Sequence, residues 1–288
     1  MPNDKLKEIA DTLDASNLVN SGAVVGVGVI DTGRIEAYLS RALTTDEAHQ
    51  LDDILGYNLA EHPVIGALSF SGSMAMPLPP STPPQPGCRI AAGNSDGDFG
   101  TLGAVIDVGG EDYILSCGHT VEGDGTVVSI NGRQIADEAQ YIPFTGAISA
   151  DAGVARIAPG AAVSSEFPPW LGHVVHQVGS MAPGMTVKQS GAASRGTGKI
   201  EAAPATVWLK NFGQCLRFDN TGIVSPLSPG QPLATAGDSG SLAIADADQK
   251  PAGIVFARFA EGGWVALSSL RAAIDWFETR FGATIRLR

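Results

Sequence analysis

The sequence is poor in cysteine, in aromatic residues and in charge. Its 288 residues include 3 cysteines, and only 6% are aromatic and 17% charged. Cys88, Cys117 and Cys215 are too few and too widely spaced for a disulfide framework or a metal-binding cluster. We therefore expect a reduced, cytoplasmic chain without metal or cofactor, whose core is filled by small aliphatic side chains.

Positive charge and long apolar runs are also scarce. The chain has 18 Lys and Arg against 30 Asp and Glu, a formal net charge of −12. A general nucleic-acid binder needs clustered basic residues, so this class is excluded. No apolar run reaches the roughly 18 residues of a membrane-spanning helix, and the polar N-terminus, MPNDKLKEIADTLD, does not resemble a secretory signal. We expect neither nucleic acid nor membrane as a partner.

Glycine and proline, in contrast, are abundant, with 36 and 18 residues. This composition is typical of short strands joined by turns. A proline tract at residues 77–86, PLPPSTPPQP, predicts an extended linker. It separates a small N-terminal unit, residues 1–76, from a larger region, residues 87–288.

The N-terminal unit has a mixed α/β pattern. Apolar residues at helical spacing predict a helix near its start, with Asn3 as the N-cap. Thr44 and Glu47 form a capping-box pattern that predicts a second helix. Three apolar runs predict strands, over residues 24–30, 35–39 and 64–70.

The larger region consists of short apolar runs separated by glycine, which predicts a β-sandwich or barrel. The runs cover residues 102–108, 113–116, 126–130, 153–157, 173–178, 186–189, 206–209, 222–224, 242–245, 253–257 and 264–267. A final helix is predicted, capped by Ser268 or Ser269 and ended by Gly282.

The segment Gly237-Asp238-Ser239-Gly240-Ser241 is the strongest local signal for chemistry. Glycines on both sides of a serine allow a tight turn that exposes the hydroxyl and directs backbone N–H groups toward one point. The same residue types also occur in ordinary turns. Ser239 is therefore a candidate nucleophile that needs a base.

His119, at the end of a predicted strand, is the best candidate base among five histidines. His49 and His62 are expected at the surface. His173 and His176 are expected on opposite faces of a strand, which is unsuited to chelation. A structural histidine is the alternative interpretation of His119.

A base histidine needs an acceptor that orients its ring. Asp151 directly precedes an apolar run, where burial of a carboxylate requires a partner. A turn residue at the start of a strand is the alternative interpretation. Asp107 and Asp137 lie in ordinary turn or surface contexts and are weaker candidates.

Together these motifs resemble those of trypsin-like serine proteases. LSCGHT around His119, ADAGVARI around Asp151 and GDSGSLAI around Ser239 match the His, Asp and Ser motifs in the order found in chymotrypsin. Residues 252–256 resemble the strand that follows the nucleophile, and the final helix also agrees. The resemblance covers about residues 87–288.

A closer similarity is to the narrow-leaf-like branch of intracellular trypsin-like proteins. The shared features are a VVGVGV strand at residues 24–29, the proline-rich join and a Gly-Thr-Leu-Gly segment at residues 100–103. The Gly-Arg-Thr-Thr-Gly motif of that branch is present only in part, as GAASRG at residues 191–196. This departure affects a loop and the choice of substrate.

The resemblance implies a mainly β protein: a chymotrypsin-like double β-barrel with a C-terminal helix, preceded by a small α/β domain. The active site would lie between the barrels. His119 would act as base toward Ser239, Asp151 would orient His119, and the N–H groups of Gly237 and Ser239 would bind the oxyanion. Cys117 is a rival nucleophile, although a buried free thiol is the common case.

The resemblance also places Leu233, Phe256 and Arg258 at the specificity pocket. Leu233, at its base, is not acidic, so we expect a small or apolar side chain before the cleaved bond and no preference for Lys or Arg. In many secreted relatives Asp238 pairs with a new N-terminus. Residues 1–86 precede the protease region here, so we expect an internal partner instead.

Three functions remain open at this point. The first is a selective intracellular serine endopeptidase acting on a protein or peptide. The second is a latent interaction or regulatory module with the protease fold. The third is an esterase. It is disfavoured because α/β-hydrolases have the order Ser, Asp, His, whereas the candidate residues here follow the order His, Asp, Ser. The N-terminal domain is expected to serve regulation, substrate capture or formation of a homo-oligomer.

Overall fold

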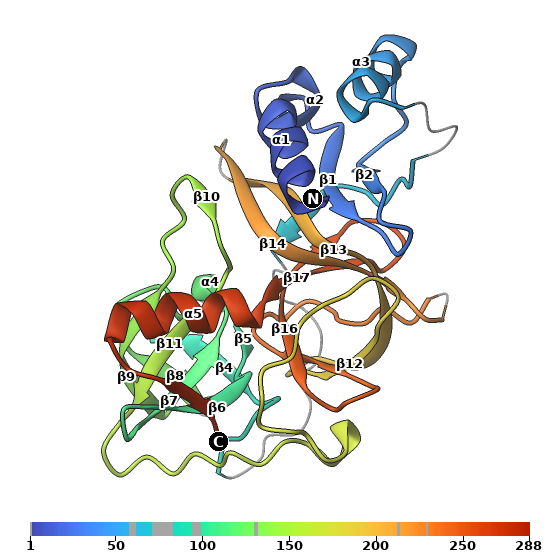
Figure 1. Cartoon of the computed structure of the whole chain (residues 1–288). Coiled ribbons are helices and arrows are strands. Elements are labelled where there is room, and N and C mark those ends of the chain that lie inside the picture. The colour runs from blue at the N-terminus through green and yellow to red at the C-terminus, as the bar shows by residue number, and fades with distance from the viewer. Residues whose placement is uncertain are drawn as a thin grey trace.

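Two curled, mainly antiparallel β-sheets form most of the molecule (Figure 1). The structure, a computed structural model, describes residues 2–57, 62–70, 83–93, 99–129, 132–211, 214–228 and 230–288. Residues 77–82 of the predicted linker lie outside this set, and the proposed domain limits stay a prediction. None of the described helices has the length and apolar character that a membrane crossing requires.

The first sheet has eight strands in the order β18-β6-β7-β11-β9-β8-β4-β5. They are β4 (Arg89–Ala92), β5 (Gly100–Thr101), β6 (Ala104–Val108), β7 (Glu111–Ser116), β8 (Val127–Ser129), β9 (Gln134–Tyr141), β11 (Gly153–Ile157) and β18 (Ile285–Leu287). Successive residues of a strand point to opposite faces, so Ile114 and Leu115 of β7 enter two different buried clusters. Both faces of the sheet are therefore covered, as in a barrel.

The second sheet has ten strands. Nine follow the order β10-β14-β17-β16-β15-β12-β13-β1-β2, and β3 pairs with β16 outside this path. They are β1 (Val24–Val29), β2 (Ile35–Leu39), β3 (Leu68–Phe70), β10 (Ala147–Ile148), β12 (Thr186–Ser190), β13 (Arg195–Asn211), β14 (Gln214–Pro226), β15 (Leu242–Ala245), β16 (Pro251–Phe259) and β17 (Val265–Ser269). Small aliphatic residues such as Val187, Val224, Val255 and Val265 fill its interior, as the shortage of aromatic residues predicts.

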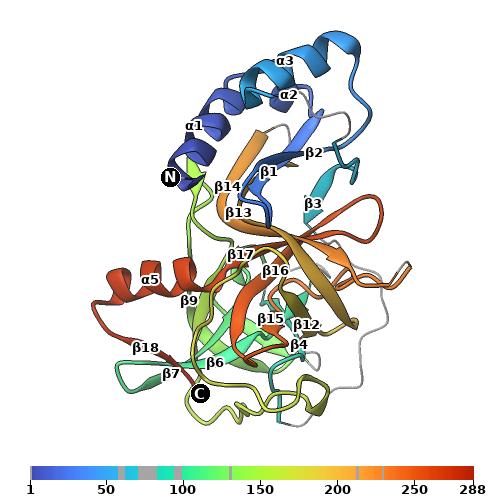
Figure 2. The ribbon, with the colours of Figure 1, turned by 45° about the vertical axis from the view of Figure 1, so that its right-hand side comes forward.

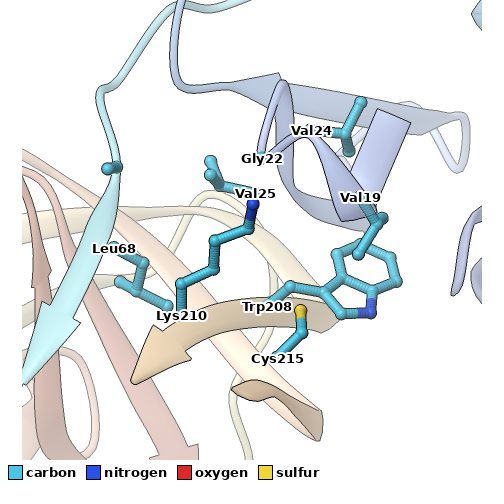
Figure 3. Close-up of a pocket in the computed structure, with 9 residues that line it drawn as sticks. Val19, Gly22, Val24, Val25, Leu68, Trp208, Lys210 and Cys215 are labelled. Atoms are coloured by element: carbon cyan, nitrogen blue, oxygen red, sulfur yellow. The ribbon is translucent and has the colours of Figure 1, made fainter. Parts of the chain in front are cut away.

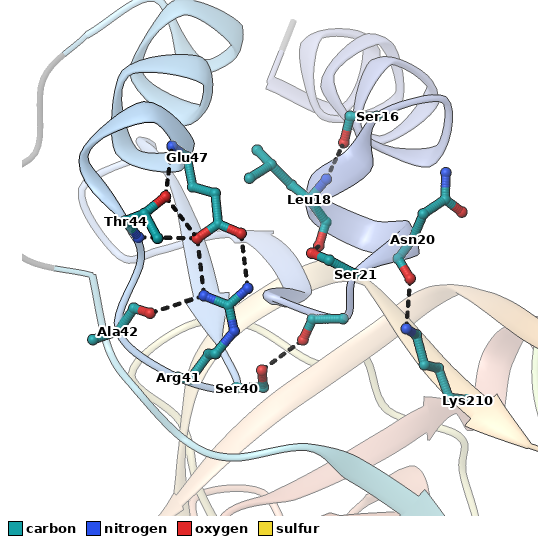
Figure 4. A network of polar contacts seen from close by, with 11 residues as sticks. Ser16, Leu18, Asn20, Ser21, Ser40, Arg41, Ala42, Thr44, Glu47 and Lys210 are labelled. Carbon is teal, nitrogen blue, oxygen red and sulfur yellow. Dashed lines mark hydrogen bonds and ion pairs between the residues drawn. The ribbon is translucent and has the colours of Figure 1, made fainter.

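Three helices, α1 (Pro2–Asp14), α2 (Asn17–Asn20) and α3 (Thr45–Leu55), cover one face of β1 and β2. The predicted capping box of α3 is confirmed, because the Thr44 hydroxyl accepts from the Glu47 N–H and the Glu47 carboxylate accepts from the Thr44 N–H (Figure 4). Arg41 binds the same carboxylate and lowers the pKa of Glu47 to about 2. Local polar contacts thus fix the position at which α3 begins.

The N-terminal strands are continuous with the second sheet. β1 pairs with β13, with Gly26 opposite Val207 and Gly28 opposite Ala205. A Cβ on Gly28 would lie 2.7 Å from the Ala205 Cβ, so glycine is required for this approach. The core of the N-terminal unit accordingly includes Trp208 of β13.

The final helix, α5 (Leu270–Phe281), has the predicted ends. The Ser269 hydroxyl accepts from the Ala272 N–H, and Gly282 ends the helix in the left-handed conformation with φ 64°. The helix packs on the first sheet, where the Phe281 ring lies 5.5 Å from that of Tyr113 on β7. After the helix, β18 pairs with β6 and returns the chain to this sheet.

Two local predictions are wrong. Residues 173–178 have no strand structure and form an irregular segment, in which the Val175 N–H donates to the Gln249 carbonyl at 2.8 Å outside any strand pairing. Asn3 lies inside α1 and does not cap it, since the helix begins at Pro2. Proline is favourable in the first helical turn because its missing N–H has no intrahelical acceptor there.

Candidate active site

Strand pairing brings His119 and Asp151 together. Ser116, the last residue of β7, lies opposite Gly153, the first residue of β11. The chain leaves β7 into the short helix α4 (Gly118–Val121), which carries His119, while Asp151 lies two residues before the first residue of β11. The two candidate side chains therefore lie just beyond one end of the same strand pair.

The contact between them is direct. His119 Nδ1 lies 2.5 Å from Asp151 Oδ2, and the His119 backbone N–H donates to Asp151 Oδ1 at 3.2 Å. Asp151 is fully buried, whereas the His119 side chain is 19% exposed. With a proton on Nδ1 directed to the carboxylate, Nε2 of the neutral ring is the acceptor that a general base requires.

Ser268 of β17, in the second sheet, holds the backbone of Asp151. Its hydroxyl accepts the Asp151 backbone N–H at 2.9 Å, and both residues are fully buried. The sequence predicts a role for Ser268 only as an alternative helix cap. Its contact spans 117 residues of chain, so no local pattern could have revealed it.

Ser239 lies on the predicted tight turn ahead of β15. The flanking glycines have φ of 96° at Gly237 and 97° at Gly240, in the region where a side chain is disfavoured. The Ser239 side chain is buried, and its Oγ donates to the Phe256 carbonyl at 3.4 Å. The glycine conformations therefore agree with the motif, whereas the expected exposure of the hydroxyl is wrong, because Ser239 is buried.

Thr101 of β5 connects this turn to the first sheet. Its N–H donates to the Ser239 carbonyl at 2.7 Å and its hydroxyl to the Gly237 carbonyl at 2.9 Å. The Thr101 carbonyl in turn accepts from the Ser116 hydroxyl at 2.7 Å, at the end of β7 next to α4. This chain of hydrogen bonds holds the serine turn beside the strand pair that carries His119 and Asp151.

Asp238 has the internal partners that the sequence could not identify. Its buried carboxylate accepts from the backbone N–H groups of Ala193, Ser194 and Thr235, and from the Ser194 hydroxyl. Burial raises the pKa of Asp238, while these hydrogen bonds act in the opposite direction. The turn that carries Ser239 is thus held by the loop at residues 191–195.

Several backbone N–H groups of the turn that carries Ser239 already donate hydrogen bonds within the protein. The Asp238, Gly240 and Ser241 N–H groups donate to the carbonyls of Thr235, Val255 and Asp238. The Gly237 backbone adjoins the Phe99 ring, since a Cβ on Gly237 would lie 2.4 Å from it. The oxyanion hole at the amides of Gly237 and Ser239 stays a prediction that this turn conformation permits.

Cys117 lies two residues before His119, but its thiol makes its hydrogen bond to another part of the chain. The thiol is buried and donates to the Val255 carbonyl at 3.1 Å. Burial raises its pKa well above the ordinary value, and the charge of Asp151 acts in the same direction. A zinc ligand or nucleophile must be a thiolate. The set of Cys117, His119 and Asp151, although close together, therefore consists of a hydrogen-bonded His–Asp pair beside a buried, protonated thiol.

The three residues predicted at the specificity pocket lie in different surroundings. Leu233 is fully buried in the interior of the second sheet, and its carbonyl accepts from the Gln189 amide at 2.7 Å. Phe256 is also buried and contacts Ser239 through its carbonyl. Arg258, two residues further along β16, is half-buried and lies opposite Ser69 of β3. The roles of all three in specificity stay predictions.

Phe70 is a site residue that sequence analysis missed. Its ring lies over that of His119, with centroids 4.5 Å apart and planes inclined by 33°. It stands at the end of β3, which was predicted as part of a strand over residues 64–70. The strand prediction identified the element, but no sequence signal indicated the strand's position beside His119.

A small cavity lies behind β3, on the side of the N-terminal helices. Val25, Leu68, Trp208, Lys210 and Cys215 are among its lining residues (Figure 3). Its volume is about 50 Å³, whereas pockets for small ligands are typically about 300–1,000 Å³. This cavity is therefore too small to hold a substrate.

Comparison with known proteins identifies the fold. No protein-family model and no curated protein sequence matches the chain. Among solved structures, a glutamic-acid-specific serine protease has a TM-score of 0.53 at 18% identity, covering 71% of this chain and 100% of its own. Thermobifida fusca protease A gives 0.52 at 18% identity, with coverage of 70% and 96%. The alpha-lytic protease homolog N4 gives 0.51 at 20% identity, with coverage of 71% and 99%.

The chain therefore has the chymotrypsin-like double β-barrel fold of trypsin-like serine proteases. The aligned share of about 70% leaves room for an N-terminal unit beyond that fold. The predicted similarity to the intracellular branch stays a prediction.

Proposed function

We propose that this protein is a serine endopeptidase in which His119, Asp151 and Ser239 form the catalytic triad. The observation that carries the proposal is the 2.5 Å contact between His119 Nδ1 and the buried Asp151 carboxylate. Buried carboxylates need such a partner, and the contact leaves Nε2 of the neutral ring as an acceptor. The serine turn held beside this pair supplies the third group.

In the proposed reaction, Ser239 Oγ attacks the carbonyl carbon of a peptide bond while His119 Nε2 takes the hydroxyl proton. The resulting oxyanion is bound by the N–H groups of Gly237 and Ser239. The C–N bond then breaks, and His119 gives its proton to the leaving amine. Water attacks the acyl ester with His119 again as base, which releases the acid and restores the serine hydroxyl. Asp151 stays ionised and stabilises the imidazolium.

For the substrate we propose a protein or peptide with a small or apolar residue before the cleaved bond. The chain has Leu233 where an acidic residue would select Lys or Arg, and we propose an intracellular processing role for the enzyme. Cleavage of a peptide library would test the preference. A strong selection of Lys or Arg would contradict it.

Labelling by a fluorophosphonate tests the proposed activity, because this probe reacts with an activated serine. We expect one label per chain, located at Ser239, in the wild type and none in Ser239→Ala. Ser241→Ala is the matched control, since this serine lies in the same turn but outside the proposed triad, and it should be labelled. Absence of labelling in the folded wild type would favour a latent module.

A further inference from the structure

β3 covers an edge of β16 directly beside the candidate catalytic residues. The pairing is antiparallel, with Phe70 opposite Ala257, Ser69 opposite Arg258 and Leu68 opposite Phe259. The other edge of this part of β16 is paired with β17. β3, which lies next to the N-terminal strands β1 and β2 (Figure 2), is therefore the added strand at this edge.

The covered edge leads to Ser239. The Ala260 N–H donates to the Ala67 carbonyl at 2.9 Å, so the backbone groups of Arg258, two residues earlier on β16, face the same edge. The pairing of β16 with β17 is irregular between Val255 and Ala257, so the position of Phe256 is given by its own contact. The Phe256 carbonyl oxygen lies 3.4 Å from Ser239 Oγ. Any peptide strand that pairs along this edge as far as Phe256 thus brings its own backbone next to the nucleophile.

The register of β3 on β16 also determines which side chain lies over His119. Phe70 faces Ala257, one residue before the position opposite Phe256. Its ring lies on His119, with Phe144 and Phe218 at centroid distances of 6.1 and 6.2 Å. The rings of His119, Phe144 and Phe218 thus line an aromatic subsite, and the Phe70 ring of the same chain fills it.

The preceding residues anchor β3 on both sides. The Glu261 N–H donates to the Ile65 carbonyl at 3.1 Å, and the Ile65 N–H donates to the Leu39 carbonyl at 2.8 Å. Leu68 is 4% exposed and belongs to the main core. The segment is thus held in its extended conformation by the N-terminal strands as well as by β16.

We propose that Leu68–Phe70 is an internal peptide bound at the substrate edge, which makes the intact chain autoinhibited. Addition of a strand to a sheet edge is a general mode of peptide binding, with main-chain hydrogen bonds for affinity and side-chain pockets for specificity. The inference rests on the proposed protease function and extends it. The substrate must displace β3, and it is an extended peptide with an aromatic side chain one residue before the residue attacked by Ser239.

Two probes distinguish competition between β3 and substrate for the β16 edge from a change in the reactivity of Ser239. A tripeptidyl phosphonate with Phe next to its reactive residue needs the β16 edge, whereas diisopropyl fluorophosphate needs only the serine and its immediate surroundings. If β3 covers the edge for about nine-tenths of the time, its release raises the peptidyl-probe rate about tenfold. We expect this increase in Phe70→Ala, measured relative to the small probe.

Val64→Ala serves as the control. It changes an exposed apolar residue of the same segment, outside β3, and should react at the wild-type rate. If Phe70→Ala does not fold by circular dichroism, Phe70→Leu, which keeps an apolar side chain without a ring, replaces it. Intact mass confirms that every chain is uncut.

Each outcome decides the question. A selective gain for the peptidyl probe in Phe70→Ala supports the inference, as does its reversal by an added peptide of sequence IGALSF but not IGALSA. Wild-type labelling by the small probe with no selective gain overturns the inference and leaves the proposed protease function standing. If the small probe labels none of these folded proteins, the proposed function fails, and the inference with it.

Discussion

Asp151 acts on the reaction only through His119 in the proposed mechanism. Its carboxylate fixes the proton on Nδ1, and an amide in its place would favour the other tautomer. We therefore expect Asp151→Asn to reduce the rate of fluorophosphonate labelling by about 10⁴-fold, with the protein still folded by circular dichroism. Asp137→Asn is the control, because Asp137 pairs with Arg156 away from the site and its loss should leave the rate unchanged. Equal rates in the two variants would contradict the role of Asp151.

Cys117 is expected to be inert as a nucleophile. Burial raises the pKa of its thiol and the Val255 carbonyl holds its proton, whereas Cys215 is exposed. At about pH 8, near the ordinary pKa of a thiol, iodoacetamide should modify Cys215 and spare Cys117 in the folded protein, as read by peptide mass spectrometry. In denaturant both should react. Cys117→Ala should retain serine labelling, and an alkylated Cys117 in the folded chain would contradict this.

Asp238 joins the turn that carries Ser239 to the loop at residues 191–195. Because this carboxyl group titrates, the stability of the folded chain should depend on pH. Burial raises the pKa of Asp238 above its ordinary value of 3.8. The folded chain therefore takes up this proton at a higher pH than the unfolded chain does. As pH falls through the raised value toward 3.8, this group stabilises the folded state, and the gain is complete below the unfolded value.

Comparison of wild type with Asp238→Asn isolates this contribution. The asparagine does not titrate, so the difference in the free energy of unfolding should shift in favour of the wild type as pH falls from about 7 to about 4. Urea denaturation at several pH values measures it. If the difference in the free energy of unfolding shifted in favour of Asp238→Asn at low pH, the hydrogen bonds to Asp238 would outweigh burial in setting its pKa.

Elements defined by nearby residues could be predicted from the sequence. The capping box at Thr44 and the ends of α5 at Ser269 and Gly282 depend on contacts within one helical turn, and all are confirmed. The position of β3 beside His119 depends on pairing with residues far along the chain. No local pattern specifies which sheet edge a strand will join, so this contact could not be predicted.

The same distinction holds for the candidate site. His119, Asp151 and Ser239 were found because each stands in a short motif. The supporting contacts of Thr101 with the serine turn and of Ser268 with Asp151 join the two sheets over more than a hundred residues of chain. They follow from the fold as a whole, and serine and threonine are too common to mark such positions.

The N-terminal unit contributes to the second sheet as well as to its own core. Trp208 of β13 is 3% exposed in the N-terminal cluster, and its indole N–H donates to Asp14. Removing residues 1–57 would therefore expose this ring and leave part of the β13 edge unpaired. We expect the truncated chain to associate, because unpaired edges and exposed apolar surface promote aggregation.

Size-exclusion chromatography and tryptophan emission test this expectation. The truncated chain should elute ahead of the position for its mass, and its emission should shift to longer wavelength. Trp208→Ala in the full chain separates the two causes, since it removes the apolar ring while β1 remains on β13. A truncated protein that stays monomeric with unchanged emission would show that the N-terminal unit is an independent appendage.

Gly103 and Gly240 bring the backbones of the two sheets into contact beneath the site. A Cβ on Gly103 would lie 2.3 Å from the Gly240 carbonyl oxygen, and one on Gly240 would lie 2.2 Å from the Ser116 hydroxyl. Rotation of one barrel against the other would break this contact, since close-packed junctions do not deform smoothly. We therefore expect the two sheets to move as one rigid unit, with any change of state confined to edge segments such as β3.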